Sequence, residues 1–155
     1  LMGRVVYIDL DTLIVGNIDW LLTYNGKFAG IEDLGSVNKH QPHLKGQLQS
    51  GMLAFSTAAL AWVWMEFLLK HNSITKKYRG DGEYLNALMF NRYLLQNIYP
   101  NQIRSYKYQV YPDKIERASV ICFHGRPSIV QSTSETVTTP TKTYEPQPWV
   151  KDFWY

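Results

Sequence analysis

Asp9 and Asp11 are the residues whose type and spacing most directly suggest chemistry. They follow a short apolar run, Val5–Ile8, whose β-branched and aromatic side chains favour a strand buried on both faces. In an extended chain residues i and i+2 point to the same side, so the two carboxylates should project together. Neighbouring carboxylates repel unless a positive charge lies between them, and their oxygen atoms suit Mg²⁺ or Mn²⁺. The pattern predicts a divalent-cation site, and a solvated acidic turn is the simpler alternative.

Two later segments place polar residues at the start of predicted elements. Ser50 and Gly51 lead into a predicted strand, Met52–Phe55, where the glycine would let a ligand approach the backbone and the serine supplies a hydroxyl. A tight turn into the strand would use the same two residues. Asp81 precedes a helix predicted over residues 82–96 and could simply cap its amino end. Each of these residues therefore has a structural explanation beside a functional one.

The segment Tyr7–Asp19 resembles the Asp-x-Asp motif of nucleotide-sugar glycosyltransferases with the GT-A fold. In both, a hydrophobic strand ends in the two acidic residues, and an apolar stretch and a small helix follow. The version is similar to that of glycogenin and the retaining bacterial lipopolysaccharide galactosyltransferases (glycosyltransferase family 8). The resemblance implies that Asp9 and Asp11 hold a divalent cation, Mn²⁺ or Mg²⁺.

A second segment, His124-Gly-Arg-Pro127, follows a predicted strand, Ser119–Phe123, and is similar to a late strand of that family that ends in histidine. The resemblance implies that His124 is the third protein ligand of the metal, that Gly125 forms a flexible turn, and that Arg126 contacts the donor diphosphate. The spacing between the histidine and the basic residue is shorter here than in glycogenin-like members. A lone histidine at a strand end is more often structural.

Two further matches concern the donor sugar. The segment Asp81–Asn86 is similar to the family motif Asp-Gln-Asp-x-Leu-Asn, with Gly82 at the glutamine position, and it implies that Asp81 lies against the sugar as the candidate catalytic residue. Gln49-Ser-Gly51 is similar to an Asn-Ser-Gly entry into a strand beside the bound sugar, with glutamine in place of asparagine. The residues predicted to bind the donor are accordingly Ser50, Gly51, Gly125 and Arg126.

These resemblances imply an enzyme that moves a sugar from a nucleotide-diphosphate donor, a UDP-sugar above all, to a carbohydrate or lipid-linked glycan acceptor. A haloacid-dehalogenase-like phosphatase is the first alternative, because such enzymes also begin with Asp-x-Asp and carry a later Gly-Asp-Gly, as at Gly80–Gly82. Against it, Thr12 replaces an expected glycine and Leu85 an expected acidic residue. A non-catalytic sugar-binding fragment is the second alternative.

Strand patterns alternate with long helical patterns, which predicts an α/β fold with a mixed sheet flanked by helices, a partial GT-A fold. The strands and helices predicted for it are Val5–Ile8, Met52–Phe55, Ser119–Phe123, 58–71 and 82–96. Residues 1–127 are predicted to be the carboxyl-terminal part of a catalytic domain, since the nucleotide-binding strands expected before Asp-x-Asp are not seen. Residues 128–155, rich in Ser, Thr and Pro, are predicted to be an extended tail ending in an aromatic segment that docks back.

Composition sets further limits. The 155 residues carry a net charge of +3 with no nucleic-acid motif, so nucleic acid is not an expected partner. The single cysteine, Cys122, excludes an internal disulfide and fits a reducing, cytoplasmic compartment. The helix over 58–71 is too short to span a membrane, which needs about 20 residues, so membrane association is expected only through other parts of a longer protein. It is apolar nearly all round, and its face around Trp62 and Trp64 should be incompletely covered.

Overall fold

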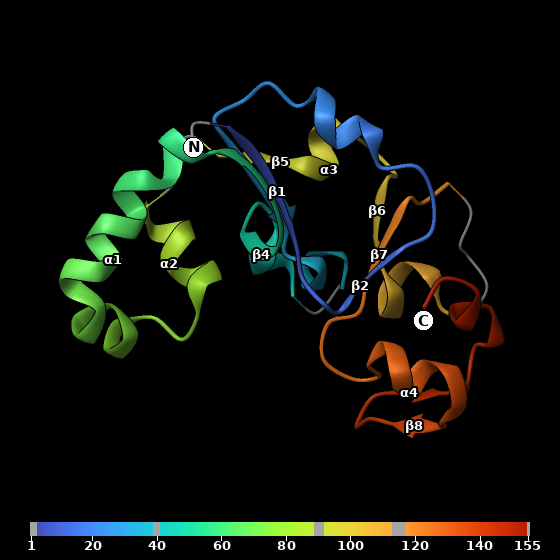
Figure 1. Cartoon of the computed structure of the whole chain (residues 1–155). Coiled ribbons are helices and arrows are strands. Elements are labelled where there is room, and N and C mark those ends of the chain that lie inside the picture. The colour runs from blue at the N-terminus through green and yellow to red at the C-terminus, as the bar shows by residue number, and fades with distance from the viewer. Residues whose placement is uncertain (1–2, 39–40, 89–91, 113–116, 155) are drawn as a thin grey trace.

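The structure is a computed structural model that describes residues 3–38, 41–88, 92–112 and 117–154, and it has the predicted α/β character (Figure 1). Within these residues the strands form a four-stranded sheet, a three-stranded sheet and a two-stranded hairpin. The four-stranded sheet has the order β1-β4-β3-β5, with β1 (Arg4–Ile8), β3 (Phe28–Glu32), β4 (Leu48–Ser56) and β5 (Tyr93–Leu94). Strand β4 is antiparallel to β1 and β3, whereas β5 is parallel to β3, so the sheet is mixed.

The three-stranded sheet is also mixed, and it contains β7, which was predicted to share a sheet with β1 and β4. Its order is β2-β7-β6, with β2 (Thr12–Ile14), β6 (Ile103–Ser105) and β7 (Val120–Cys122). Strand β7 is antiparallel to β2 and parallel to β6. The strands are therefore confirmed individually, but the prediction of a single sheet is wrong.

A turn at Asp9–Asp11 explains the division into two sheets. The amide of Thr12 donates to the carbonyl of Asp9 (3.1 Å), which closes the turn and redirects the chain from β1 into β2. Strand β1 lies at the edge of its sheet, and its side chains at Val5 and Tyr7 are 37 % and 44 % exposed. The prediction that this strand is buried on both faces is thus wrong, because only its alternate residues face the core.

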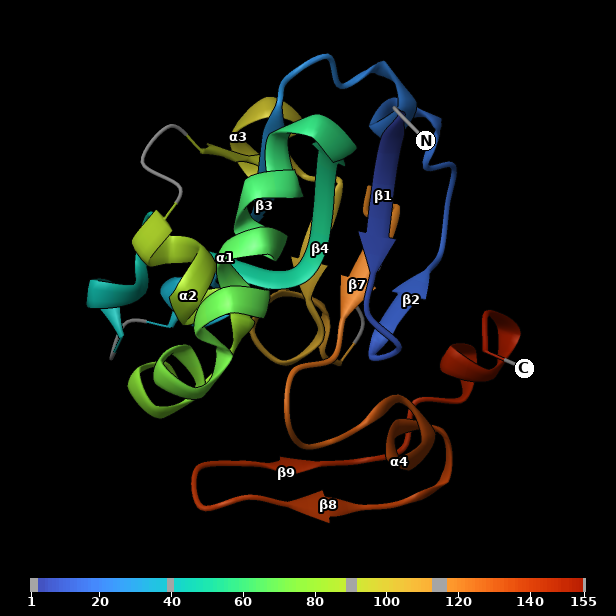
Figure 2. The same ribbon diagram turned by 60° about the vertical axis from the view of Figure 1, so that its left-hand side comes forward.

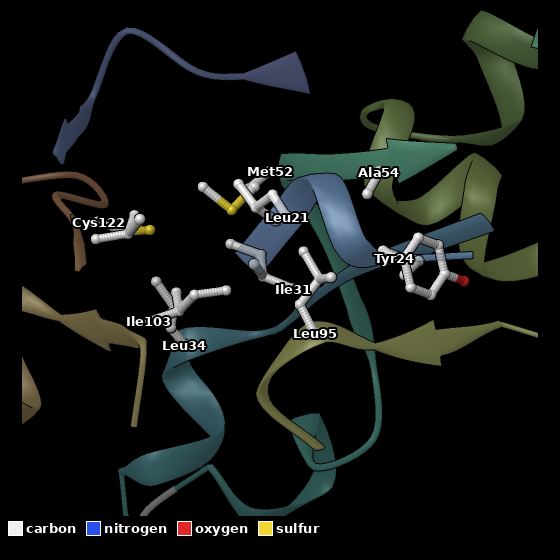
Figure 3. Close-up of a cluster of buried hydrophobic side chains, with 11 residues drawn as sticks. Leu21, Tyr24, Ile31, Leu34, Met52, Ala54, Leu95, Ile103 and Cys122 are labelled. Atoms are coloured by element: carbon white, nitrogen blue, oxygen red, sulfur yellow. The ribbon is translucent and has the colours of Figure 1, made fainter. Parts of the chain in front are cut away.

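One buried cluster joins the two sheets (Figure 3). Met52 of β4 and Ile31 of β3 meet Ile103 of β6 and Cys122 of β7 there, and all four side chains are at most 4 % exposed. Because interiors are closely packed, this shared core fixes the position of one sheet relative to the other. It thereby sets the geometry of the turn between β1 and β2.

The helices are α1 (Thr57–Lys77), α2 (Asp81–Leu88), the short α3 (Leu95–Ile98) and α4 (Ile129–Ser134). Helices α1 and α2 cover the face of the four-stranded sheet that is turned away from the shared core, whereas α3 packs in that core and α4 packs on another cluster. Helix α1 begins where the hydroxyl of Ser56 accepts from the amide of Ala59, and its backbone departs from helical geometry at Lys70. Val63 of α1 and Leu85 of α2 pack against Leu53, which faces away from the shared core. Figure 1 shows α1 and α2 lying together at the side of the molecule away from the carboxyl terminus.

Three predictions of local structure need correction. The helix predicted over 58–71 continues to Lys77 as α1. The helix predicted over 82–96 ends at Leu88 among the described residues; 89–91 lie outside them, and β5 and α3 follow. The aromatic residues of Tyr108–Tyr111 favour a short strand by their composition, but Tyr106–Val110 forms a π-helix instead. Short 3-10 turns complete the chain at Asp19–Thr23, Leu34–Val37, Pro42–Leu44 and Pro148–Asp152.

The segment after residue 127 is folded rather than extended. It forms α4 and a hairpin of β8 (Val137–Thr138) and β9 (Thr143–Tyr144), which lie below the sheets in Figure 2, and the last 3-10 turn, which lies to their upper right at the carboxyl terminus. Ser128 and Gln131 make a capping box that starts α4. Buried apolar residues placed sparsely among Ser and Thr, namely Ile129, Tyr144 and Val150, join a second core cluster with Leu13, Tyr106 and Phe123. The expected docking of the aromatic end is confirmed, because Trp149 and Trp154 pack on that cluster.

The expected exposed face of α1 is also confirmed. Only Val63 and Ile74 of this helix are buried, whereas Trp62 and Trp64 are 48 % and 60 % exposed. In the part of the chain that the structure describes, no helix combines the length and the apolar character needed to cross a membrane.

Candidate functional site at the junction of the two sheets

The Asp9–Asp11 turn is held by main-chain hydrogen bonds on both sides. The amide of Asp9 donates to the carbonyl of Gly51 on β4 (2.9 Å), and the carbonyl of Asp11 accepts from the amide of Phe123 just after β7 (2.7 Å). The turn is therefore fastened to one strand of each sheet. This places the predicted metal ligands beside the predicted donor-binding residue Gly51 and beside the strand that leads to His124.

The hydroxyl of Tyr7 contacts the carboxylate of Asp9 and is affected by the charges of Asp81 and Asp11. This hydroxyl donates to Oδ1 of Asp9 (2.8 Å), and that hydrogen bond is the main reason why the pKa of Tyr7 is raised. Burial and then the charges of Asp9, Asp81 and Asp11 raise the pKa of Tyr7 further. Asp9 bonds to Gly51 through its amide, and Asp81 bonds to the neighbouring Ser50 through its carboxylate, so the three acidic residues lie in one region. We call Tyr7, Asp9, Asp11 and Asp81 the carboxylate group.

The charge of this group is not compensated within the described residues. Partial burial and then the charge of Asp9 raise the pKa of Asp11 above its ordinary value. The ion pairs found among the described residues lie elsewhere, between Lys70 and Glu66 and between Arg79 and Glu83. A pair of unneutralised carboxylates fits a site that a divalent cation can occupy.

Asp81 reaches this place because α2 is tied to β4. The side-chain amide of Asn86 bonds the carbonyl of Leu48, and the amide of Leu48 donates to Oδ1 of Asn86 (2.9 Å). At the start of the helix, Oδ1 of Asp81 accepts from the hydroxyl of Ser50 and from the amide of Gly82, both at 2.8 Å. Ser50 lies within β4, whereas the sequence had predicted that it would precede the strand.

A Cβ atom could be added at Gly51 or at Gly82 without a steric clash. A Cβ at Gly51 would meet only Cδ1 of Ile31, at 3.6 Å, and one at Gly82 would lie 3.7 Å from the backbone and hydroxyl of Ser50. Both contacts are of ordinary van der Waals length. The structure thus brings Asp9, Asp11, Ser50, Gly51 and Asp81 together as predicted residues of one region.

His124 belongs to a different set of contacts. Its Nε2 lies 2.7 Å from the hydroxyl of Ser105 at the end of β6, and its ring lies 5.4 Å from that of Tyr108. Burial, with a smaller effect from the charge of Lys107, lowers the pKa of His124 to about 4, and Asp33 opposes this shift. The imidazole is therefore neutral at pH 7. We call Ser105, Lys107 and His124 the histidine group.

The residues after His124 differ in how closely they are held. Gly125 has a φ of +74°, a conformation that favours glycine, and a Cβ there would lie 3.2 Å from Nζ of Lys107. Arg126 is exposed on the loop that follows. Burial lowers the pKa of Lys107, so this lysine is partly withdrawn from water beside Gly125. The loop thus brings two basic residues to the end of β7.

The two groups are neighbours along the backbone but are separate in their side-chain interactions. The charges of Asp11 and Asp9 contribute to the pKa of Cys122, which burial raises to about 12, and Cys122 lies two residues before His124. The charged side chains that act on His124 itself are Lys107 and Asp33. Among residues 3–38, 41–88, 92–112 and 117–154, no three His, Cys, Asp or Glu side chains are arranged to hold a metal ion.

Sequence reasoning missed Tyr7, Ser105 and Lys107. Tyr7 carried a usable signal, since residues 7, 9 and 11 alternate on one side of an extended chain. Ser105 and Lys107 carried none, because their place depends on β6 lying parallel to β7.

Comparisons of the chain with protein-family models, with curated proteins and with solved structures find no match.

Proposed function

We propose that this chain is part of a metal-dependent glycosyltransferase with the GT-A fold, which moves a sugar from a nucleotide-diphosphate donor to a carbohydrate or lipid-linked glycan acceptor. A UDP-sugar is the donor that the family resemblance favours. The observation that carries the proposal is the carboxylate group: Asp9 and Asp11 on one turn and Asp81 from a distant helix all act on the hydroxyl of Tyr7. A nucleotide-sugar donor needs a cation beside its phosphates and, close by, a hydrogen-bond acceptor for its sugar hydroxyls.

The residues present fit a divalent cation. Asp9 and Asp11 would hold it through carboxylate oxygens, and a cation would offset both the burial and the charge of Asp9 that raise the pKa of Asp11. Bound there, Mn²⁺ or Mg²⁺ would supply Lewis-acid stabilisation of the charge that develops on the departing diphosphate. Tyr7 orients Asp9 by its hydrogen bond, as partners of metal-binding carboxylates do.

Asp81 has a defined part in this proposal. Its Oδ1 is occupied by the hydroxyl of Ser50 and the amide of Gly82, so the carboxylate is held in one orientation. Its Oδ2 accepts no hydrogen bond from a described residue and can accept one from a sugar hydroxyl. Gly51 leaves space for the sugar to approach β4. Arg126, exposed after β7, would add a charge-assisted contact to a phosphate.

His124 enters the proposal conditionally. Its pKa of about 4 keeps the imidazole neutral, which is the form that binds metals. To become the third ligand the ring must leave the hydroxyl of Ser105. Donor binding could drive this change if the cation gains a ligand by it.

Calorimetric titration with UDP, UDP-sugars and GDP-sugars, with and without Mn²⁺, tests the proposal. We expect the chain to bind a nucleotide sugar only in the presence of the cation, and Asp81→Asn to weaken nucleotide-sugar binding more than UDP binding. Asp152→Asn, an exposed aspartate at the far end of the chain, is the matched control. Metal-independent binding of free sugar would favour the sugar-binding alternative, and release of phosphate from a phosphate ester would favour the phosphatase.

A further inference from the structure

The exposed apolar residues of α1 form one continuous band. Trp62, Met65 and Leu69 follow the spacing i, i+3, i+7, and Trp64 and Leu68 follow i, i+4 beside them. All five are exposed, with Trp64 at 60 % and Leu69 at 79 %. Single exposed apolar residues are ordinary, but a band with two tryptophans on one helix marks a surface for an apolar partner.

The band continues into a groove between α1 and α2. Trp64 belongs to both, since it stacks on Phe67 at 6.0 Å and lines a hollow of about 480 Å³ with Val63, Tyr84 and Leu85. Figure 1 shows these two helices projecting together from the sheets. The apolar surface is therefore presented at the outside of the molecule and away from the histidine group.

The charge of the chain is concentrated at the same helix. Residues 57–79 contain four basic residues, Lys70, Lys76, Lys77 and Arg79, against one acidic residue, Glu66. The whole chain has 16 basic and 13 acidic residues, so the remainder has twelve of each and is formally neutral. Lys70 pairs with Glu66, and Arg79 pairs with Glu83 of α2, so the positive charge that has no ion pair among the described residues of this segment is that of Lys76 and Lys77 at the end of α1.

We propose that α1 docks on the surface of an anionic lipid bilayer. Tryptophan and leucine side chains would enter the boundary between headgroups and acyl chains, and the lysines at the end of the helix would contact lipid phosphates. Charge decides between the possible partners. A second copy of the chain would bring two positive segments together, which is unfavourable, whereas a negative surface attracts them. The docking does not rest on the proposed transferase activity, although Asp81 also lines the hollow between α1 and α2.

Flotation of the 155-residue chain with vesicles tests this proposal. We expect binding to vesicles of equal phosphatidylcholine and phosphatidylglycerol, little binding to phosphatidylcholine alone, and weaker binding as salt is raised. Lys76→Glu with Lys77→Glu should weaken binding by about tenfold or more, and Leu69→Ser should weaken it as well. The controls are Lys45→Glu with Lys151→Glu, and Leu22→Ser, which change exposed residues elsewhere and should bind like the unmodified chain.

Three results would overturn the proposal. The first is no binding to either vesicle, and the second is equal binding to both that the charge reversal leaves unchanged. The third is self-association without lipid, measured by sedimentation, that Leu69→Ser abolishes, since the occupant of the band would then be a second copy. All substituted residues are exposed, and circular dichroism will show whether each variant is folded.

Discussion

The hydrogen bond between the carbonyl of Asp11 and the amide of Phe123 links the backbones of the carboxylate group and the histidine group, and the two groups differ in what holds their side chains. In the carboxylate group the backbone of Asp9 and Asp11 is fixed by bonds to both sheets, while the charges remain uncompensated. In the histidine group the side chain of His124 is itself occupied by Ser105 and has lost its charge through burial. The first group is arranged to receive a positive ligand. The second must rearrange before it can take part.

The largest loss of stability is expected from substitution of Phe123, which supports both groups. Phe123 stacks on Tyr106 at 4.2 Å, is 1 % exposed, and carries the amide that bonds Asp11. Phe123→Ala should lower the free energy of unfolding by about 3–5 kcal/mol, because it leaves a cavity in the core. Denaturant titration measures this loss, and Phe153→Ala, at a half-exposed ring, should cost much less. Equal losses for the two variants would show that β7 is not anchored as described.

The histidine group should make the stability of the folded chain depend on pH. The pKa of His124 is about 4 when folded and 6.5 when unfolded, so only the unfolded state takes up the proton between these values. Its contribution to stability is therefore full above pH 6.5 and is lost as the pH falls towards 4. From pH 7 to pH 4.5 this amounts to roughly 2–3 kcal/mol.

His124→Gln should remove that part of the pH dependence. Denaturant titrations of both proteins at pH 7 and pH 4.5, in buffer with chelator, give the difference, while the other titrating groups cancel. If both proteins lose the same stability on acidification, His124 is not a buried neutral residue.

Within the carboxylate group, Tyr7→Phe should have the smallest effect on folding and a clear one on binding. It removes the hydrogen bond to Asp9 at a half-exposed residue, so stability should change by no more than about 1 kcal/mol. Loss of a residue that orients a ligand should weaken Mn²⁺ binding by about tenfold. Tyr93→Phe, at another exposed tyrosine, is the control for both measurements. Unchanged Mn²⁺ binding in Tyr7→Phe would separate Tyr7 from the site.

Local patterns in the sequence predicted individual elements better than their assembly. Ser56 or Thr57 before an apolar run predicted the start of α1, which Ser56 caps, and the run Val5–Ile8 predicted β1. The pairing of strands depends on contacts between distant residues, so the division at Asp9–Asp11 into two sheets was not visible. The folded segment after residue 127 was missed because a few buried side chains, such as Tyr144, suffice when a core already exists to receive them.

The candidate site was predicted on its acidic side and not on its histidine side. Asp9 and Asp11 were paired from their spacing in an extended chain, but they lie in a turn, where the charge of Asp9 still acts on Asp11. Asp81 meets them through Ser50, a hydrogen bond between residues 31 positions apart that only the fold reveals. The contacts of His124 depend on β6 and the π-helix that follows it, and neither its partner Ser105 nor Lys107 carries a sequence signal.

Calorimetric titration of the chain with Mn²⁺ tests most directly the claim that the carboxylate group is the cation site. We expect Asp11→Asn to weaken Mn²⁺ binding by about tenfold or more, because it removes a charged ligand, while Asp152→Asn binds like the unmodified chain. Without a bound donor, His124→Gln should change the affinity much less than Asp11→Asn, since its ring is occupied by Ser105. Equal Mn²⁺ affinity in Asp11→Asn and in the unmodified chain would contradict the account.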